Sequence, residues 1–150
     1  MTATNHALTG ALIGFSVSDP FIAIPLAFIS HFVLDIVPHF GSNTKNDDWV
    51  KSINFKILLA VDIIFCIILG LAILILRPRN YLLAFICAII ATSPDLVHLK
   101  RFINVNKDKT HKPNWFEVFS GRIQWFEKPS GALVEFVYGM SMILLIRNFF

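Results

Sequence analysis

An almost unbroken apolar run near the middle of the chain constrains its fold more than any other feature. Residues 53–76 read INFKILLAVDIIFCIILGLAILIL and contain two charged side chains, Lys56 near one edge and Asp62 within the run. The run is longer than the roughly 20 apolar residues that a helix needs to cross the hydrocarbon core of a bilayer. In lipid a spanning segment must satisfy its own backbone hydrogen bonds, which a helix does. The run therefore predicts a transmembrane helix.

The composition of the whole chain supports the same class. The 150 residues are 55% hydrophobic and 15% charged, with a mean hydropathy of +0.66. A typical soluble domain carries about 25% charged residues, and a globule of this size could not hide so much apolar surface. We therefore expect one integral membrane domain over residues 1–150.

Turn and cap signals divide the rest of the chain. Pro78 lies in a tight connection after the apolar run, Ser18, Asp19 and Pro20 form a helix start, and Ser130 can cap a final helix. These signals predict an all-α bundle of about five helices, near residues 4–16, 19–38, 53–76, 80–98 and 130–149, with a polar loop over 99–129. The first helix would reach only about 20 Å, so we expect it to be short or re-entrant.

The basic residues predict the orientation and the partners. Lys and Arg concentrate in two connections, 41–56 and 99–129, which fall on the same side of the predicted bundle. By the positive-inside rule this side is cytoplasmic. The basic residues form no stripe interleaved with aromatic residues, so we expect membrane lipids as partners and no nucleic acid. Gly10 and Gly14 have the small-xxx-small spacing of helix contacts in membranes, so a homodimer is a further expectation.

Ionisable side chains within the apolar segments are the strongest indication of function. An ionisable group inside a bilayer costs roughly 2.5 to 3.5 kcal/mol on insertion scales, so it is hard to keep unless it pairs or binds something. Six such side chains lie within or at the edges of the apolar segments: His31, Asp35, His39, Asp62, Asp95 and His98. Helical spacing puts the first three on one face and the last two on another.

The predicted topology brings these side chains to one end of the bundle, together with His6 and Glu135. Imidazole and carboxylate donors without thiolates suit Zn, and also Mn, Fe or Mg. A bound divalent ion would reduce the penalty for burying the carboxylates. The convergence therefore predicts a metal site, in which Asp62 or Glu135 serves as general base if it is not a ligand. We expect an anionic substrate group to be held by Arg101, Arg122 or Lys128.

Structural roles compete with this interpretation. Asp95 follows Ser93 and Pro94 and is placed to cap a helix, and Glu135 could pair with Arg122 or Lys128. Histidines at helix ends, as expected for His6 and His39, commonly cap helices or lie at the membrane interface. Asp62, with apolar neighbours on all sides, is the hardest to explain as a packing residue.

Three short stretches resemble a known family. HALTGALIG at the start, HFVLDIVPHF and SPDLVH resemble the bacterial membrane-bound metal-dependent hydrolases of the LexA-binding inner-membrane type. The HxxxD spacing of His31 and Asp35 is also similar to that of the all-helical zinc-dependent phospholipase C group. The resemblance implies a multi-pass protein of the bacterial inner membrane whose metal ligands are His6, His31, Asp35, Asp95 and His98.

Two functional hypotheses follow from the sequence. The first is a membrane hydrolase whose divalent metal, Zn in the first instance, activates water to cleave a phosphoester, most plausibly in a lipid headgroup. The second is a small non-enzymatic membrane protein for transport, proton relay or scaffolding, in which buried Asp and His residues pair or exchange protons.

Overall fold

The computed structural model describes residues 1–41, 47–107, 109–124 and 126–150, so part of the predicted cytoplasmic connection 41–56 lies outside the described residues. Within these ranges the chain is helical and contains no strand, which confirms the predicted all-α class. The helices are α1 (Ala3–Ser16), α2 (Pro20–Ile36), α3 (Asp47–Lys51), α4 (Ile53–Leu76), α5 (Tyr81–Thr92), η1 (Ser93–His98), α6 (Leu99–Asn106), α7 (Trp115–Ile123), α8 (Gly131–Ile146) and η2 (Arg147–Phe149).

The predicted count of about five helices is too low. If α5, η1 and α6 are counted as one continuous segment, and α8 with η2 as another, the described residues form seven. The two additional helices are α3 and α7, and α6 extends the predicted helix 80–98 into the predicted polar loop 99–129. The helix of α5 continues into α6 because Pro94 lies at the start of the 3₁₀ turn η1, where it lacks an amide that would need a partner.

A local capping signal starts α7. The Asn114 side chain accepts a hydrogen bond from the Glu117 N–H, and the Glu117 carboxylate accepts one from the Asn114 N–H, both at 2.8 Å. This reciprocal capping box satisfies two amides that have no partner within the helix. A short helix of nine residues therefore forms in a segment rich in charge.

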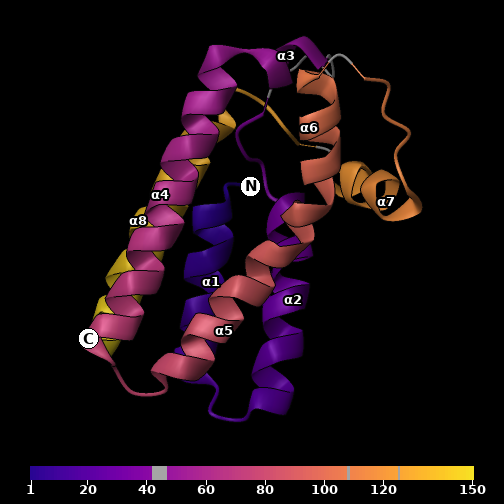
Figure 1. The fold of residues 1–150 in the computed structure, drawn as a ribbon. Helices are drawn as coiled ribbons and strands as arrows, with labels where there is room; N and C mark the ends of the chain where they lie inside the picture. The colour runs from indigo at the N-terminus through magenta and orange to yellow at the C-terminus, as the bar shows by residue number, and fades with distance from the viewer. Residues whose placement is uncertain (42–46, 108, 125) are drawn as a thin grey trace.

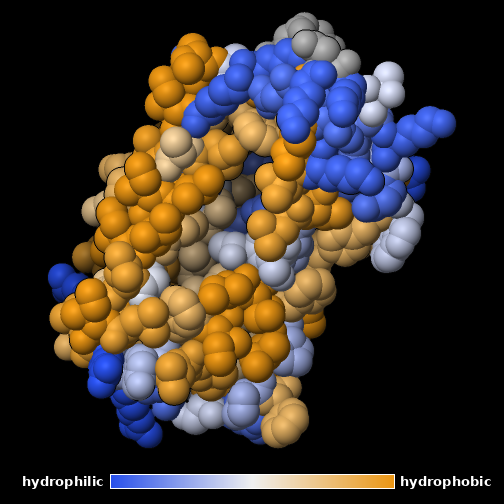
Figure 2. Space-filling view, viewed as in Figure 1, coloured by the Kyte–Doolittle hydropathy of each residue, from blue (hydrophilic) through white to orange (hydrophobic). Residues whose placement is uncertain are grey.

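In the described part of the chain, three helical segments are long and apolar enough to cross a membrane: Ile53–Leu76, Tyr81–Asn106 and Gly131–Phe149. Their outward faces carry large apolar side chains, such as Ile75 at 72% and Leu133 at 69% exposure. Figure 2 shows this as an apolar body below a polar end. An apolar exterior of this extent indicates a membrane protein, since lipid rather than water is its favourable surroundings.

Helix α1 lies in the middle of the bundle, where it contacts α2, α4, α5 and α8. Its glycines allow the closest of these contacts. A Cβ at Gly10 would lie 2.3 Å from the carbonyl oxygen of Cys87, and one at Gly14 would lie 2.5 Å from Cα of Ala84, both on α5. The small-residue face is thus buried within the chain. The expected homodimer stays a prediction, and this face does not supply its surface.

The polar elements gather at one end. Figure 1 shows α3, α6 and α7 at the upper end, with the N-terminus of the chain just below them and the connection between α4 and α5 at the lower end. The described parts of the two basic connections therefore lie at the same end of the bundle. The start of α1 is close beneath this polar layer.

Candidate metal centre

Carboxylates from two other helices hold the first turn of α1. Asp62 of α4 accepts hydrogen bonds from the backbone N–H groups of Ala3 at 2.8 Å and Thr4 at 2.9 Å, and also from the Thr4 hydroxyl. Glu135 of α8 accepts one from the Thr2 N–H at 3.0 Å. The first amides of a helix have no partner within it, and negative charge is favourable at this end.

These contacts show that Asp62 and Glu135 cap the N-terminus of α1. The side chain of Thr2, in the N-cap position, makes no cap hydrogen bond of its own. The two carboxylates take over that role and fix the height and direction of α1 in the bundle. His6 lies one turn further along the same helix, so the carboxylates also position His6. The predicted role of Asp62 and Glu135 as general base stays a prediction.

His6 and His31 form the centre of a buried polar cluster. Their rings stack with centroids 4.0 Å apart, and both side chains are fully buried. Asp35, one turn after His31 on α2, faces both rings. Its Oδ1 lies 3.2 Å from Nε2 of His6, and its Oδ2 lies 3.3 Å from Nε2 of His31. The prediction that His31 and Asp35 share a helix face is confirmed by this common partner.

The histidine nitrogens of this cluster lack the partners that buried polar atoms normally have. Among the described residues, neither nitrogen of His6 has a hydrogen-bond partner of acceptable geometry, and Nε2 of His31 has none either. Buried polar groups are almost always paired, because an unpaired one costs free energy. The carboxylate of Asp35 therefore lies close to both imidazole rings, but the geometry is not that of a hydrogen bond.

The other nitrogen of His31 fixes the state of its ring. Nδ1 lies 2.8 Å from the carbonyl oxygen of Ala91 on α5. A carbonyl only accepts hydrogen bonds, so this assignment places a proton on Nδ1 and leaves the lone pair of a neutral ring on Nε2. Metal-ligating histidines are commonly oriented in this way by a backbone carbonyl behind the ring.

Asp95 completes a group that could hold a metal ion. Its Oδ1 lies 3.7 Å from Nε2 of His31, and one ligand atom each from His6, His31 and Asp95 lies within 4.8 Å of the others. Ligands about 2.1 Å from a tetrahedral zinc ion are about 3.4 Å apart, so modest side-chain movement would bring these atoms to a common ion. Asp95 is 33% exposed, whereas Asp35 is 1% exposed, so the cluster opens on the side of Asp95.

Asp35 has further neighbours. Its Oδ1 lies 2.7 Å from the amino group of Met1, and its Oδ2 accepts a hydrogen bond from Nε2 of Gln124 at 3.3 Å. Gln124 directly follows α7. The carboxylate therefore links α1 and α2 to the segment that covers the polar end.

His98 lies outside the group of three. Its Nε2 is 3.3 Å from Oγ of Ser120, which is buried in α7. Nearby, Nε2 of His111 contacts Oε2 of Glu117 at 2.9 Å. Burial acts to raise the pKa of Glu117, but the hydrogen bonds from His111 and the Asn114 amide outweigh it, so this pKa is lowered. The predicted role of His98 as a metal ligand is not tested by these contacts.

His39 is not part of the histidine stripe expected on α2. The helix ends at Ile36, since Val37 is extended and precedes Pro38. His39 instead pairs through its backbone with Phe126 and Lys128, and its Nδ1 lies 2.8 Å from the Val37 carbonyl oxygen. Its role is to join the connection after α2 to the one before α8.

The predicted anion-binding residues lie at the same polar end. Arg101 is on α6, close enough to His98 for an electrostatic interaction, whereas Arg122 on α7 and Lys128 before α8 are exposed. The sequence analysis missed Ala91, Ser120 and Gln124. No side-chain signal marks Ala91, which acts through its carbonyl, but the capping box at Asn114 would have revealed α7 and thus the two residues near its end.

Comparison with known proteins finds no family, no curated relative and no solved structure that matches this chain.

Proposed function

We propose that this chain is a membrane hydrolase that binds a divalent metal ion, Zn in the first instance, and cleaves a phosphoester. The ligands are His6, His31 and Asp95, with Asp35 as a second carboxylate beside both imidazoles. The observation that carries the proposal is the set of buried imidazole nitrogens that have no hydrogen bond to any described residue, of which Nε2 of His31 lies 3.3 and 3.7 Å from the Asp35 and Asp95 carboxylates.

A metal ion explains this cluster better than ion pairing alone. Asp35 and Asp95 both lie close to Nε2 of His31, at 3.3 and 3.7 Å, and the amino group of Met1 pairs with Asp35. A divalent cation would neutralise the charge that remains on the two carboxylates. If the histidines were present only to pair with Asp35, the buried nitrogens should have found hydrogen-bond geometry. The stacked rings instead present nitrogens to the same small volume as the carboxylate oxygens.

The choice of hydrolysis rests on the chemistry of the donor set and on the short motifs that resemble membrane-bound hydrolases. A divalent cation supplies Lewis acidity, which polarises a phosphoryl oxygen and makes water a better nucleophile. Asp95 is on the exposed side, so the substrate phosphate meets the cluster there. Arg101, Arg122 and Lys128 supply positive charge at this end, which we place on the cytoplasmic side of a bacterial inner membrane.

Elemental analysis tests the metal site. The full chain, purified in detergent and reconstituted with Zn or Mn, should contain close to one equivalent of metal. His31→Gln should lose most of it, since Gln lacks the directed nitrogen lone pair. His111→Gln is the matched control, because His111 contacts Glu117 outside the cluster and its substitution should leave the metal content unchanged.

Absence of metal from the parent chain before and after reconstitution would overturn the proposal. In that case the Asp and His residues act as a packing or proton-relay network, which is the non-enzymatic alternative. Metal present without release of phosphate from para-nitrophenyl phosphate or from phosphatidic acid in vesicles would keep the site and refute the hydrolase.

A further inference from the structure

A small apolar groove lies between α4 and α5 and is also lined by α1. It has about 70 Å³ of free volume, and its walls include Ala7, Cys66, Gly70, Phe85, Ala88 and Thr92. Gly70 keeps it open, because a Cβ at this position would lie 3.2 Å from the Phe85 ring.

One end of this groove lies at the level of the histidine cluster. Ala7 directly follows His6, Thr92 precedes Asp95 by one turn, and Cys66 contacts Thr4, whose amide is held by Asp62. Figure 2 shows a hollow between the apolar surfaces of these helices, with polar atoms in its depth. The apolar groove and the buried, unpartnered nitrogens of His6 are therefore neighbours on α1.

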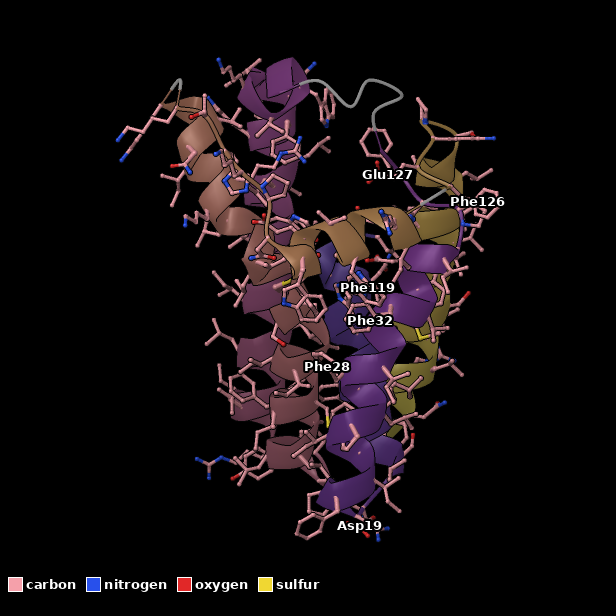
Figure 3. All side chains as sticks on the ribbon, turned by 90° about the vertical axis from the view of Figure 1, so that its right-hand side faces the viewer. Asp19, Phe28, Phe32, Phe119, Phe126 and Glu127 are labelled. Atoms are coloured by element: carbon pink, nitrogen blue, oxygen red, sulfur yellow. The ribbon has the colours of Figure 1, made fainter. Side chains whose placement is uncertain are left out.

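The approach from the polar end is covered. Helix α7 lies across α2 there, with the centroid of the Phe119 ring 5.9 Å from that of the Phe32 ring. Figure 3 shows Phe119 above Phe32, and Phe28 below both. Ser120 contacts His98, and Gln124 donates to Asp35. These contacts cover the cluster on the side of α7. Its more exposed side is that of Asp95, which lies in Tyr81–Asn106, one of the segments long and apolar enough to span a bilayer.

We propose that the substrate is a phospholipid that enters sideways from the bilayer between α4 and α5, with a few methylene groups of one acyl chain in the groove and its phosphate at the cluster. This rests on the proposed function for the identity of the reacting group, but the position of the acyl chain follows from the groove itself. A lipid is the occupant because the walls are apolar and two of the three helices that form them face lipid. Positive charge at the polar end suits an anionic headgroup.

The test is a labelling experiment that does not depend on catalysis. The full chain is reconstituted into phosphatidylcholine vesicles that contain a small fraction of phosphatidic acid with a photoreactive diazirine near the end of one acyl chain. After illumination, mass spectrometry locates the labelled residues. Labelling should concentrate on the groove-lining parts of α4 and α5.

Gly70→Leu should reduce labelling of the groove by about tenfold, because its side chain occupies the space of several methylene groups. Ala60→Leu is the matched control, since Ala60 is an exposed position on the same helix, and it should leave the pattern unchanged. His31→Gln should retain labelling of the groove even though it loses metal.

Uniform labelling along all lipid-facing helices, unaffected by Gly70→Leu, would overturn the inference. Groove labelling in a protein that binds no metal would refute the proposed function and leave the lipid site standing. Metal binding with uniform labelling would refute the lipid site and leave the proposed metal site standing. If Gly70→Leu fails to fold, competition by unlabelled phosphatidic acid against the photoreactive lipid replaces it. Labelling of a specific groove should fall as the competitor saturates it, whereas labelling that does not fall would overturn the inference.

Discussion

Two groups of acidic side chains face α1 about one turn apart, and they differ in whether their polar neighbours have hydrogen-bond partners. At the first turn, Asp62 and Glu135 accept hydrogen bonds from the amides of residues 2 to 4. One turn later, Asp35 and Asp95 face imidazole nitrogens that have no hydrogen-bond partner. The first group has the properties of a helix cap, and the second has those of a ligand set.

The contrast shows that burial of an ionisable group in an apolar helix does not by itself identify a functional site. Asp62 is the residue that the sequence marks most strongly, because it interrupts the most apolar run of the chain. Yet its oxygens already have partners. What distinguishes the histidine cluster is that its buried nitrogens have no hydrogen bond to any described residue.

The largest expected effect is a loss of stability when the cap of α1 is removed. Asp62→Ala leaves two backbone amides and a hydroxyl without their acceptor, and each buried unsatisfied donor costs about 1–3 kcal/mol, so we expect a loss of about 3 kcal/mol or more in unfolding free energy. Thermal and denaturant unfolding in detergent would measure it. Since Asp62 is not a ligand in this assignment, a chelator should leave the difference from the parent unchanged.

Asp19→Ala is the control for this substitution. Asp19 caps α2 by accepting one hydrogen bond from the Phe21 amide at 2.8 Å, in an exposed position. Loss of such a cap costs about 1 kcal/mol. If Asp62→Ala were no more destabilising than Asp19→Ala, or if a chelator abolished its effect, Asp62 would belong with the ligands and the distinction between the two groups would fail.

The next effect tests the ligand set. A ligand that binds only the folded state adds about 2.7 kcal/mol of stability when its concentration is 100 times its dissociation constant. Removal of metal with a chelator should therefore lower the unfolding free energy of the parent by about this amount. His6→Gln should abolish the chelator effect while changing the stability of the metal-free protein much less.

His39→Gln separates this effect from general loss of a buried histidine. His39 is 2% exposed, but it lies in the connection after α2 and is not in the group that could hold a metal ion. The chelator effect should persist in this variant. A chelator effect that disappears equally in His39→Gln would mean that metal acts elsewhere on the chain.

Much of the scaffold could be predicted from the sequence, because long apolar runs leave few structural choices. The bounds of α4 agree with the predicted 53–76, and α1 begins one residue before the expected position. The errors lie where polar and apolar residues mix. Helix α6 depends on a 3₁₀ turn through Pro94, and α7 depends on a cap between Asn114 and Glu117.

The sequence could predict that His6, His31 and Asp95 come together, but not which acidic residues bind the start of α1 instead. Helical spacing placed His31 beside Asp35, and topology brought His6 and Asp95 to the same end. Spacing could not show that Asp62 and Glu135 accept hydrogen bonds from α1, because those donors are backbone amides that every residue carries. Nor could it show that the Ala91 carbonyl orients His31, since that contact joins residues 60 positions apart.

The smallest expected effect extends the comparison to a third acidic residue, Glu117, whose partners are satisfied as those of Asp62 are. Its pKa is lowered from the ordinary 4.5, because the hydrogen bonds from His111 and the Asn114 amide outweigh burial. A lowered folded-state pKa adds stability that is complete above the unfolded pKa and disappears as the pH falls through the folded one. Hydrogen exchange of α7 amides should therefore quicken below about pH 4.5, the ordinary value. Glu117→Gln should remove this dependence.

If the pH dependence survives in Glu117→Gln, another group causes it. Helix α7 would then cover the cluster without depending on the cap between Asn114 and Glu117.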